Sequence, residues 1–228
     1  AQVSAYTFSR SVQTYTDITG GMVLGPTTSG GSVAYVDGLG NATTGSGGSH
    51  PNFIKVGPGY PIGFPFAYNG GVFDRIGISP AGWISLGSSA NGATAVYVNG
   101  GTSDPLSVNV ASTGTNVPDP DRLNRIAAAA IGGLMQSSAA PTGELRVETI
   151  GTAPNRVCVV QWKNFRASDF FPGSPNRFNF QIRLNEVDNS VEVRYKDPAT
   201  EWFQDYVGAQ VGLRGATANR NATDWNRV

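Results

Sequence analysis

The sequence predicts an all-β protein, an antiparallel β-sandwich of jelly-roll or Ig-like type with long surface loops and little or no helix. Segments of the second half alternate apolar and polar residues with a period of two, which is typical of strands with one buried face. The 228 residues include 30 glycines and 14 prolines, as expected where turns separate many short strands. This length suits one sandwich domain over residues 1–228.

The first half predicts short strands that are separated by glycine and proline. Residues 1–10 form an amino-terminal strand whose core is Val3 to Phe8, and this strand can be exchanged with a neighbouring subunit. Further strands are expected at Gly63 to Tyr68, Val72 to Ser79, Trp83 to Leu86 and Ala93 to Val98. Ala127 to Ala130 predicts a buried strand or a short turn. The stretches 38–51 and 99–121 are long loops, which are either functional or surface decoration.

The second half carries the most regular pattern. Phe178 to Leu184 and Val191 to Tyr195 alternate cleanly on either side of a turn-like segment, which predicts an antiparallel hairpin. Leu145 to Thr149 pairs in the same way with Arg156 to Trp162. The latter segment is apolar on both parities, so we expect it in the middle of a sheet. Residues 216–228 form a carboxy-terminal tail.

The composition excludes several partner classes. Charged residues make up 14% of the chain and the 16 basic residues balance the 16 acidic ones, so neither nucleic acid nor a membrane surface is an expected partner. The apolar stretch 126–135 is too short for membrane insertion. The chain begins at Ala1 without an initiator Met, which predicts a secreted protein, extracellular or on the cell surface, that has lost a signal peptide. Cys158 is the only cysteine and is expected to pack as a small apolar residue.

No pattern in the sequence predicts an enzyme. His50 is the only histidine, and no GxSxG motif accompanies it. A carboxylate-dependent glycoside hydrolase is the least favoured alternative. Its candidate acids are Glu144, Glu148, Glu186 and Glu192 with the loop residues Asp119 and Asp121. No cofactor is expected, although Asp119 and Asp121 can contribute oxygen ligands to a calcium ion.

Aromatic residues form the candidate ligand-binding group. They fall outside the alternating pattern, so they either stack on a glycan or a partner protein or plug the ends of the sandwich. These residues are Phe170, Phe171, Trp202, Phe203 and Tyr206. Trp83 and Trp162 lie within strand patterns and are expected in the core.

Several segments together resemble a known family. They are YTFS at 6–9, PIGFPFAYNG at 61–70, ISPAGWISLG at 78–87, GTAPNRV at 151–157, QWKNF at 161–165, FQIRL at 180–184, VEVRY at 191–195 and QVGLRG at 210–215. In this order they are similar to an amino-terminal β-sandwich module of secreted and cell-surface proteins of Bacteroidota, which use type IX secretion. The resemblance implies a sandwich fold and a surface location, with no catalytic set to carry over. The chain departs from it after Ile126, where relatives carry an acidic stretch.

Three function classes follow from these observations. The first is an extracellular, non-catalytic structural or adhesive protein that can assemble as a surface filament subunit, through self-association or contact with other surface proteins. Val3, Tyr6 and Phe8 are the candidate assembly residues, because an exposed strand can add to a neighbour's sheet. The alternative is a carbohydrate-binding module that uses the loop aromatics, with or without calcium. The glycoside hydrolase is the third.

Overall fold

The computed structural model describes residues 3–25, 27–29, 32–34, 54–79, 82–99, 106, 124–128, 144–165, 178–196, 211–216 and 225–227. The first strands are β1 (Met22–Gly25), β2 (Thr27–Ser29), β3 (Ser32–Ala34), β4 (Ile54–Gly57), β5 (Tyr60–Tyr68), β6 (Gly71–Ser79), β7 (Trp83–Gly87) and β8 (Val96–Asn99). The remaining strands are β9 (Arg125–Ala127), β10 (Glu144–Ile150), β11 (Val157–Phe165), β12 (Phe178–Asn185), β13 (Val191–Tyr195), β14 (Gly212–Arg214) and β15 (Trp225–Arg227). Two 3₁₀ helices are described, η1 (Val3–Ala5) and η2 (Ser89–Thr94).

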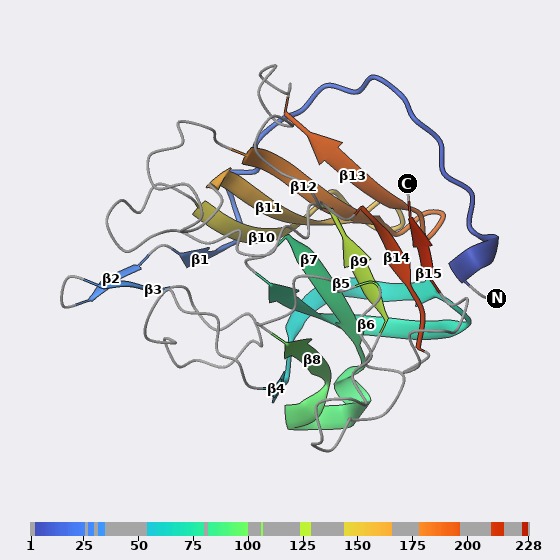
Figure 1. The fold of residues 1–228 in the computed structure, drawn as a ribbon, viewed down its shortest axis with the longest axis horizontal. Helices are drawn as coiled ribbons and strands as arrows, with labels where there is room; N and C mark the ends of the chain where they lie inside the picture. The colour runs from blue at the N-terminus through green and yellow to red at the C-terminus, as the bar shows by residue number, and fades with distance from the viewer. Residues whose placement is uncertain are drawn as a thin grey trace.

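Two antiparallel sheets face each other (Figure 1). The five-stranded sheet has the order β1-β10-β11-β12-β13, and the six-stranded sheet has the order β15-β14-β9-β7-β6-β5. Two small sheets, β2-β3 and β4-β8, accompany them. The predicted all-β antiparallel sandwich is confirmed. Among the described residues, no helix has the length and apolarity that crossing a membrane requires.

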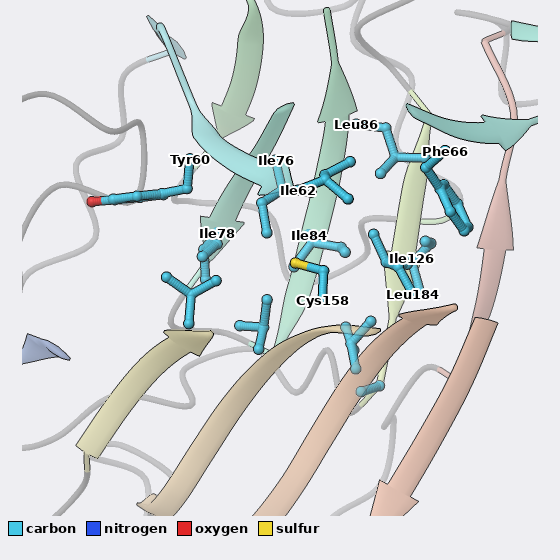
Figure 2. Close-up of a cluster of buried hydrophobic side chains, with 14 of the residues drawn as sticks. Tyr60, Ile62, Phe66, Ile76, Ile78, Ile84, Leu86, Ile126, Cys158 and Leu184 are labelled. Atoms are coloured by element: carbon cyan, nitrogen blue, oxygen red, sulfur yellow. The ribbon is translucent and has the colours of Figure 1, made fainter. Parts of the chain in front are cut away.

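The core lies between the inner faces of the two sheets. On β5 the buried and exposed residues alternate strictly, as the period of a half-buried strand demands. Figure 2 shows side chains such as Ile62, Ile84 and Ile126 from the six-stranded sheet pointing toward Cys158 and Leu184 of the other sheet. A second, smaller cluster lies on the outer face of the six-stranded sheet, where β8 covers β6 and β7. It comprises Trp83, Ala95, Val96, Val98, Leu106 and Ala127.

Most of the predicted strands are observed. The hairpin of β12 and β13 pairs in register from Phe180 with Tyr195 to Leu184 with Val191. The strand β11 lies in the middle of its sheet, as its two-sided apolar pattern predicted. Trp83 and Trp162 are both fully buried.

The outer face of β11 and β12 is covered by the amino-terminal segment 14–20. Gln161 and Gln181 are buried there and hydrogen-bond to each other, with 2.8 Å between Nε2 of Gln181 and Oε1 of Gln161. The Gln161 amide also accepts from the Ile18 backbone N–H at 2.9 Å, and Gln181 donates to the Thr16 carbonyl at 2.8 Å. Segment 14–20 therefore supplies hydrogen-bond partners to the buried amides of Gln161 on β11 and Gln181 on β12.

The strand expected over Val3 to Phe8 is wrong. Val3–Ala5 is a turn of 3₁₀ helix, in which the Val3 carbonyl accepts from the Tyr6 N–H at 3.1 Å. Val3 is fully buried in the core, and the Tyr6 ring lies 5.7 Å from the Tyr68 ring. The alternation of apolar residues therefore reflects two side chains that close one end of the sandwich, while Phe8 is 42% exposed.

Two further expectations need correction, and the buried strand expected from Ala127 onward is confirmed at Ala127 itself. The tail expected over residues 216–228 contains β15, which pairs with β14 at the edge of the six-stranded sheet. The strand expected at Ala93 to Val98 begins only at Val96, because its first residues belong to η2. The segment around Ala127 is a short strand, Arg125–Ala127, whose pairing with β7 and β14 buries it completely.

Cys158 is expected to resist thiol reagents in the folded protein. Its side chain is fully buried on β11, and burial raises the pKa of the thiol to about 12. Because the thiolate is the reactive form, an aromatic disulfide reagent should label Cys158 only after unfolding by urea. Stoichiometric labelling of the native protein within minutes would contradict this burial.

Candidate functional site

A cleft of about 450 Å³ opens beside the turn that joins β5 and β6. Three asparagines from different segments line it, together with Ser88: Asn69 from this turn, Asn91 from η2, and Asn124, which directly precedes β9. The complete lining is Asn69, Gly70, Gly71, Val72, Phe73, Gly87, Ser88, Asn91, Asn124 and Ala216. Among these described residues none is ionisable, so the cleft presents neutral hydrogen-bonding groups.

The β5–β6 turn places Asn69 in the lining of the cleft. Asn69 and Gly70 have φ angles of 51° and 81°, the left-handed pair that a two-residue type I′ hairpin requires. The Asn69 N–H donates to the Tyr6 hydroxyl at 3.0 Å, and its Nδ2 donates to Oδ1 of Asn124 at 3.0 Å. These two hydrogen bonds therefore connect the turn to the amino-terminal segment and to Asn124, the residue before β9.

The opposite wall is the 3₁₀ helix η2, which Asp74 of β6 anchors. The Ser89 N–H donates to Oδ1 of Asp74 at 2.7 Å, and the Ser89 hydroxyl donates to Oδ2. Burial alone would raise the pKa of the Asp74 carboxyl, but the hydrogen bonds from Ser89 outweigh it and hold this pKa below its usual value. Ser88 caps the helix by accepting from the Ala90 N–H at 3.3 Å.

The cleft is suited to a neutral, hydroxyl-rich ligand. An asparagine amide offers both two donors and an acceptor, the combination that matches sugar hydroxyls. Phe73, which is 6% exposed, and Val72, which is 64% exposed, add apolar surface beside the amides. Ligand sites usually combine a few placed polar groups with apolar walls in this way.

A pair of buried arginines lies next to the cleft on the outer face of the six-stranded sheet. Arg125 stands opposite Ser85 of β7 and Arg214 of β14 in the sheet register. Its guanidinium carbon lies 4.8 Å from the centre of the Trp83 ring and 5.6 Å from that of Tyr97. Burial, together with the neighbouring Arg214, lowers the pKa of Arg125 to about 9. Stacking on two rings helps to hold this cation inside the fold, which gives it a structural role beside the cleft.

The four acids considered for hydrolysis that lie among the described residues are engaged by arginines or by backbone. Arg146 donates to both carboxylate oxygens of Glu144, at 2.8 and 3.0 Å. Arg156 holds Glu186 by two side-chain bonds, the first at 2.8 Å, and Glu192 lies 2.8 Å from Arg194. Glu148 accepts from the Gly20 N–H at 3.1 Å. The arginine hydrogen bonds lower the pKa of Glu144 and of Glu186.

The candidate residues expected from the sequence divide into two groups. Val3, Tyr6 and Phe8 are described, and the first two of these contact the core of their own chain. The aromatics Phe170, Phe171, Trp202, Phe203 and Tyr206, together with Asp119, Asp121 and His50, lie outside the described residues. In the part of the chain that the structure describes, no three His, Cys, Asp or Glu residues gather as a metal site. The calcium site and the aromatic glycan site therefore stay predictions.

Sequence reasoning missed the three asparagines of the cleft. The Asn69-Gly70 pair is the usual signal of a type I′ turn and could have located the first of them. Asn91 and Asn124 carry no comparable signal, because single amides in loops are common and only the fold brings these residues to the same cleft.

Comparison with known proteins gives one match. Neither the curated proteins nor the solved structures contain a match to this chain. The family model described as "NIDO related" matches residues 5–227, which span both sheets and the cleft. The chain belongs to the NIDO-related family.

Proposed function

We propose that this chain is an extracellular, non-catalytic adhesive module that binds neutral glycans in the cleft between η2 and the β5–β6 turn. The observation that carries the proposal is that Asn69, Asn91 and Asn124, from three different segments, line one cleft of about 450 Å³. A cleft of this size falls within the range of small-molecule sites, and its neutral amides suit hydroxyl groups better than charged ligands.

The family supports the extracellular part of this proposal. NIDO-related domains are extracellular-type β domains, and the match covers residues 5–227. The resemblance of the quoted segments to secreted proteins of Bacteroidota is compatible with this location and adds display on a bacterial surface as a prediction. Adhesion is the role that an exposed sandwich with a neutral glycan site would serve.

The state of the acidic residues supports the non-catalytic part. A glycosidase needs a general acid with a raised pKa, and an arginine does the reverse to a carboxyl beside it. The pKa values of Glu144 and Glu186 are both lowered by such arginines. These two acids act as partners for the arginines that join neighbouring segments, and we assign them no chemistry.

Replacement of Asn91 by alanine is expected to weaken glycan binding. Asn91 lines the cleft, while its backbone N–H donates to the Ser88 carbonyl at 3.0 Å within η2, so the variant removes the amide without removing that bond. Loss of one or two neutral hydrogen bonds should weaken binding by about three- to tenfold. A glycan array with fluorescently labelled protein identifies the sugar, and calorimetric titration then measures Kd for wild type and Asn91→Ala.

The matched control is Gln13→Ala. It removes an amide of similar chemistry from the exposed segment 7–14, where the Gln13 side chain donates a hydrogen bond of 3.4 Å to the Ser11 hydroxyl. Glycan binding should be unchanged in this variant. The array is run with and without calcium, which also tests the predicted role of Asp119 and Asp121. An array without any binding in either condition, or equal Kd values for Asn91→Ala and wild type, would refute the cleft as the glycan site.

A further inference from the structure

The edge strand β13 differs from the other described edges of the sandwich. It is the last strand of the five-stranded sheet and runs over Val191–Tyr195 without proline, glycine or a register shift. The edge strands β1 and β15 are shorter, and β1 also carries an irregularity between Val23 and Gly25. A regular edge of this kind is a template for another strand.

The edge strand β5 of the six-stranded sheet is protected in two ways. It contains Pro61 and Pro65, and side chains of the opposite sheet occupy its backbone groups. The Thr149 hydroxyl donates to the Ile62 carbonyl at 2.7 Å, and Oδ1 of Asn189 accepts from the Ala67 N–H at 2.7 Å. Among the described residues, no side chain bonds in this way to the backbone of Val191 or Val193 in β13.

The hydrogen-bond pattern of the β12–β13 hairpin shows which backbone groups of β13 point outward. The Asn185 N–H donates to the Ser190 carbonyl, and the Lys196 N–H donates to the Asn179 carbonyl, each at 3.0 Å. Because hydrogen-bonded pairs alternate along an antiparallel ladder, Glu192 and Arg194 bond inward to β12. The N–H and C=O of Val191 and Val193 therefore point away from β12, and no group among the described residues bonds to them.

The side chains of β13 make the edge complementary to itself. When two copies of the strand run antiparallel with Val193 opposite Val193, Glu192 of each copy lies opposite Arg194 of the other, and Val191 lies opposite Tyr195. Opposite charges facing each other across a strand pair are stabilising, whereas like charges are not. The same register turns the outward groups of Val193 in both copies toward each other, which is the condition for a continuous ladder.

The exposed segment 7–14 is the one described element that runs beside this edge (Figure 1). Its described link to β13 is a bond of 3.4 Å from Nη1 of Arg194 to the Thr14 carbonyl. Among the described residues, it makes no backbone hydrogen bond to β13. The segment covers the edge loosely, so a second strand can displace it by breaking that single long bond.

We propose that β13 is a self-association edge, through which two copies of this chain pair antiparallel about Val193 and join their five-stranded sheets. The partner is a second copy because this two-fold arrangement places Glu192 of each copy opposite Arg194 of the other. The attraction that already joins the two residues within one chain, at 2.8 Å, then also acts across the edge, in the isologous geometry of symmetric dimers. The inference does not rest on the glycan cleft, which lies on another part of the molecule.

Charge variants test the pairing through the mass in solution. Wild type should move from 23.9 kDa toward twice this mass with rising concentration in sedimentation equilibrium. Arg194→Glu places two acids on each edge, and Glu192→Lys places two bases there. Each variant alone should dimerise about tenfold more weakly, because two attractive pairs become repulsive. A mixture of the two variants restores both pairs and should dimerise as well as wild type.

Lys196→Glu is the matched control, because it makes the same change in charge just beyond β13 and should leave dimerisation intact. Circular dichroism checks that every variant folds. If either charged variant fails to fold, Val193→Pro replaces it, since it removes an outward N–H and leaves the bonds to β12 in place. Val193→Ala is its control, because it loses the packing of the valine side chain against the core but keeps the N–H. A monomeric wild type at all concentrations overturns the proposal. A dimer that none of the β13 variants weakens also overturns it, because such a dimer forms by another route, for example by exchange of segment 7–14. A mixture of the two charge variants that stays monomeric overturns it as well.

Discussion

Replacing Trp162 with alanine should lower the free energy of unfolding by about 4 kcal/mol, the range found for large aromatic residues removed from cores. Trp162 is fully buried on β11 and stacks on Phe180 with 5.0 Å between the ring centres. Its Nε1 donates to the Ser79 carbonyl of β6 at 3.2 Å, so one side chain joins the two sheets. The variant loses apolar burial, an aromatic pair and the hydrogen bond between the sheets.

Urea unfolding followed by far-ultraviolet circular dichroism measures this change, since the signal does not depend on the tryptophan removed. Val187→Ala is the control, because Val187 is 66% exposed and its loss should change stability by less than about 0.5 kcal/mol. Trp162→Phe keeps the stack on Phe180 but loses the bond to Ser79, and should fall between the two. If the free energy of unfolding of Trp162→Ala were within about 1 kcal/mol of the wild-type value, far less than a large core cavity costs, the sheets would not meet at this residue.

The strands of the second half were predictable because each has one face on a continuous core. Along β12, the apolar residues Phe180, Ile182 and Leu184 are all buried, so the local pattern and the tertiary environment agree. The amino-terminal segment shows the opposite case. The segment from Val3 to Phe8 mixes apolar and polar residues as a strand does, but Tyr6 packs against Tyr68 of β5, a partner that the local sequence does not indicate.

The buried glutamines show a related limit. Gln161 and Gln181 stand opposite each other on β11 and β12, and sequence alone gives no reason for their burial. The reason is the amino-terminal segment that crosses the sheet and bonds to both amides. The two strand sequences alone do not predict that another segment covers this face. The covering segment has no secondary structure of its own, so it leaves no pattern in the sequence.

The candidate cleft was not predictable because its chemistry is ordinary. Sequence reasoning looked for histidines, acid pairs and aromatic clusters, whose spacing carries information about function. The spacing of asparagines along the sequence carries no such information. Only the fold brings the amides of Asn69 and Asn124 to within 3.0 Å of each other. A neutral binding site of this kind therefore becomes visible only when the fold is known, whereas the β13 self-pairing rests on a pattern, Val-Glu-Val-Arg-Tyr, that the sequence already displays.

Replacing Gly87 with alanine should lower the free energy of unfolding by about 3 kcal/mol, at the upper end of what overpacking usually costs. A Cβ atom at Gly87 would lie 2.0 Å from the Ala95 carbonyl oxygen and 2.7 Å from the Ala95 carbonyl carbon. These are backbone atoms of the residue that directly precedes β8, so no rotation of a side chain can relieve the clash. Either β7 or β8 has to move, which disturbs the Trp83 cluster and the cleft that Gly87 lines.

Gly20→Ala is the control, because it makes the same chemical change against a neighbour that can move. A Cβ atom there would lie 2.2 Å from Oε1 of Glu148, the end of a flexible side chain that can rotate away. The rotation gives up the hydrogen bond of 3.1 Å from the Gly20 N–H to this carboxylate, which costs no more than about 1 kcal/mol at a partly exposed site. Gly20→Ala should therefore change the free energy of unfolding by less than about 1 kcal/mol. Thermal and urea unfolding of both variants give the comparison. Equal stability of the two variants would mean that the Ala95 carbonyl oxygen lies farther from Gly87 than the 2.0 Å expected for an added Cβ atom. The part of the cleft wall that Gly87 forms would then be displaced as well.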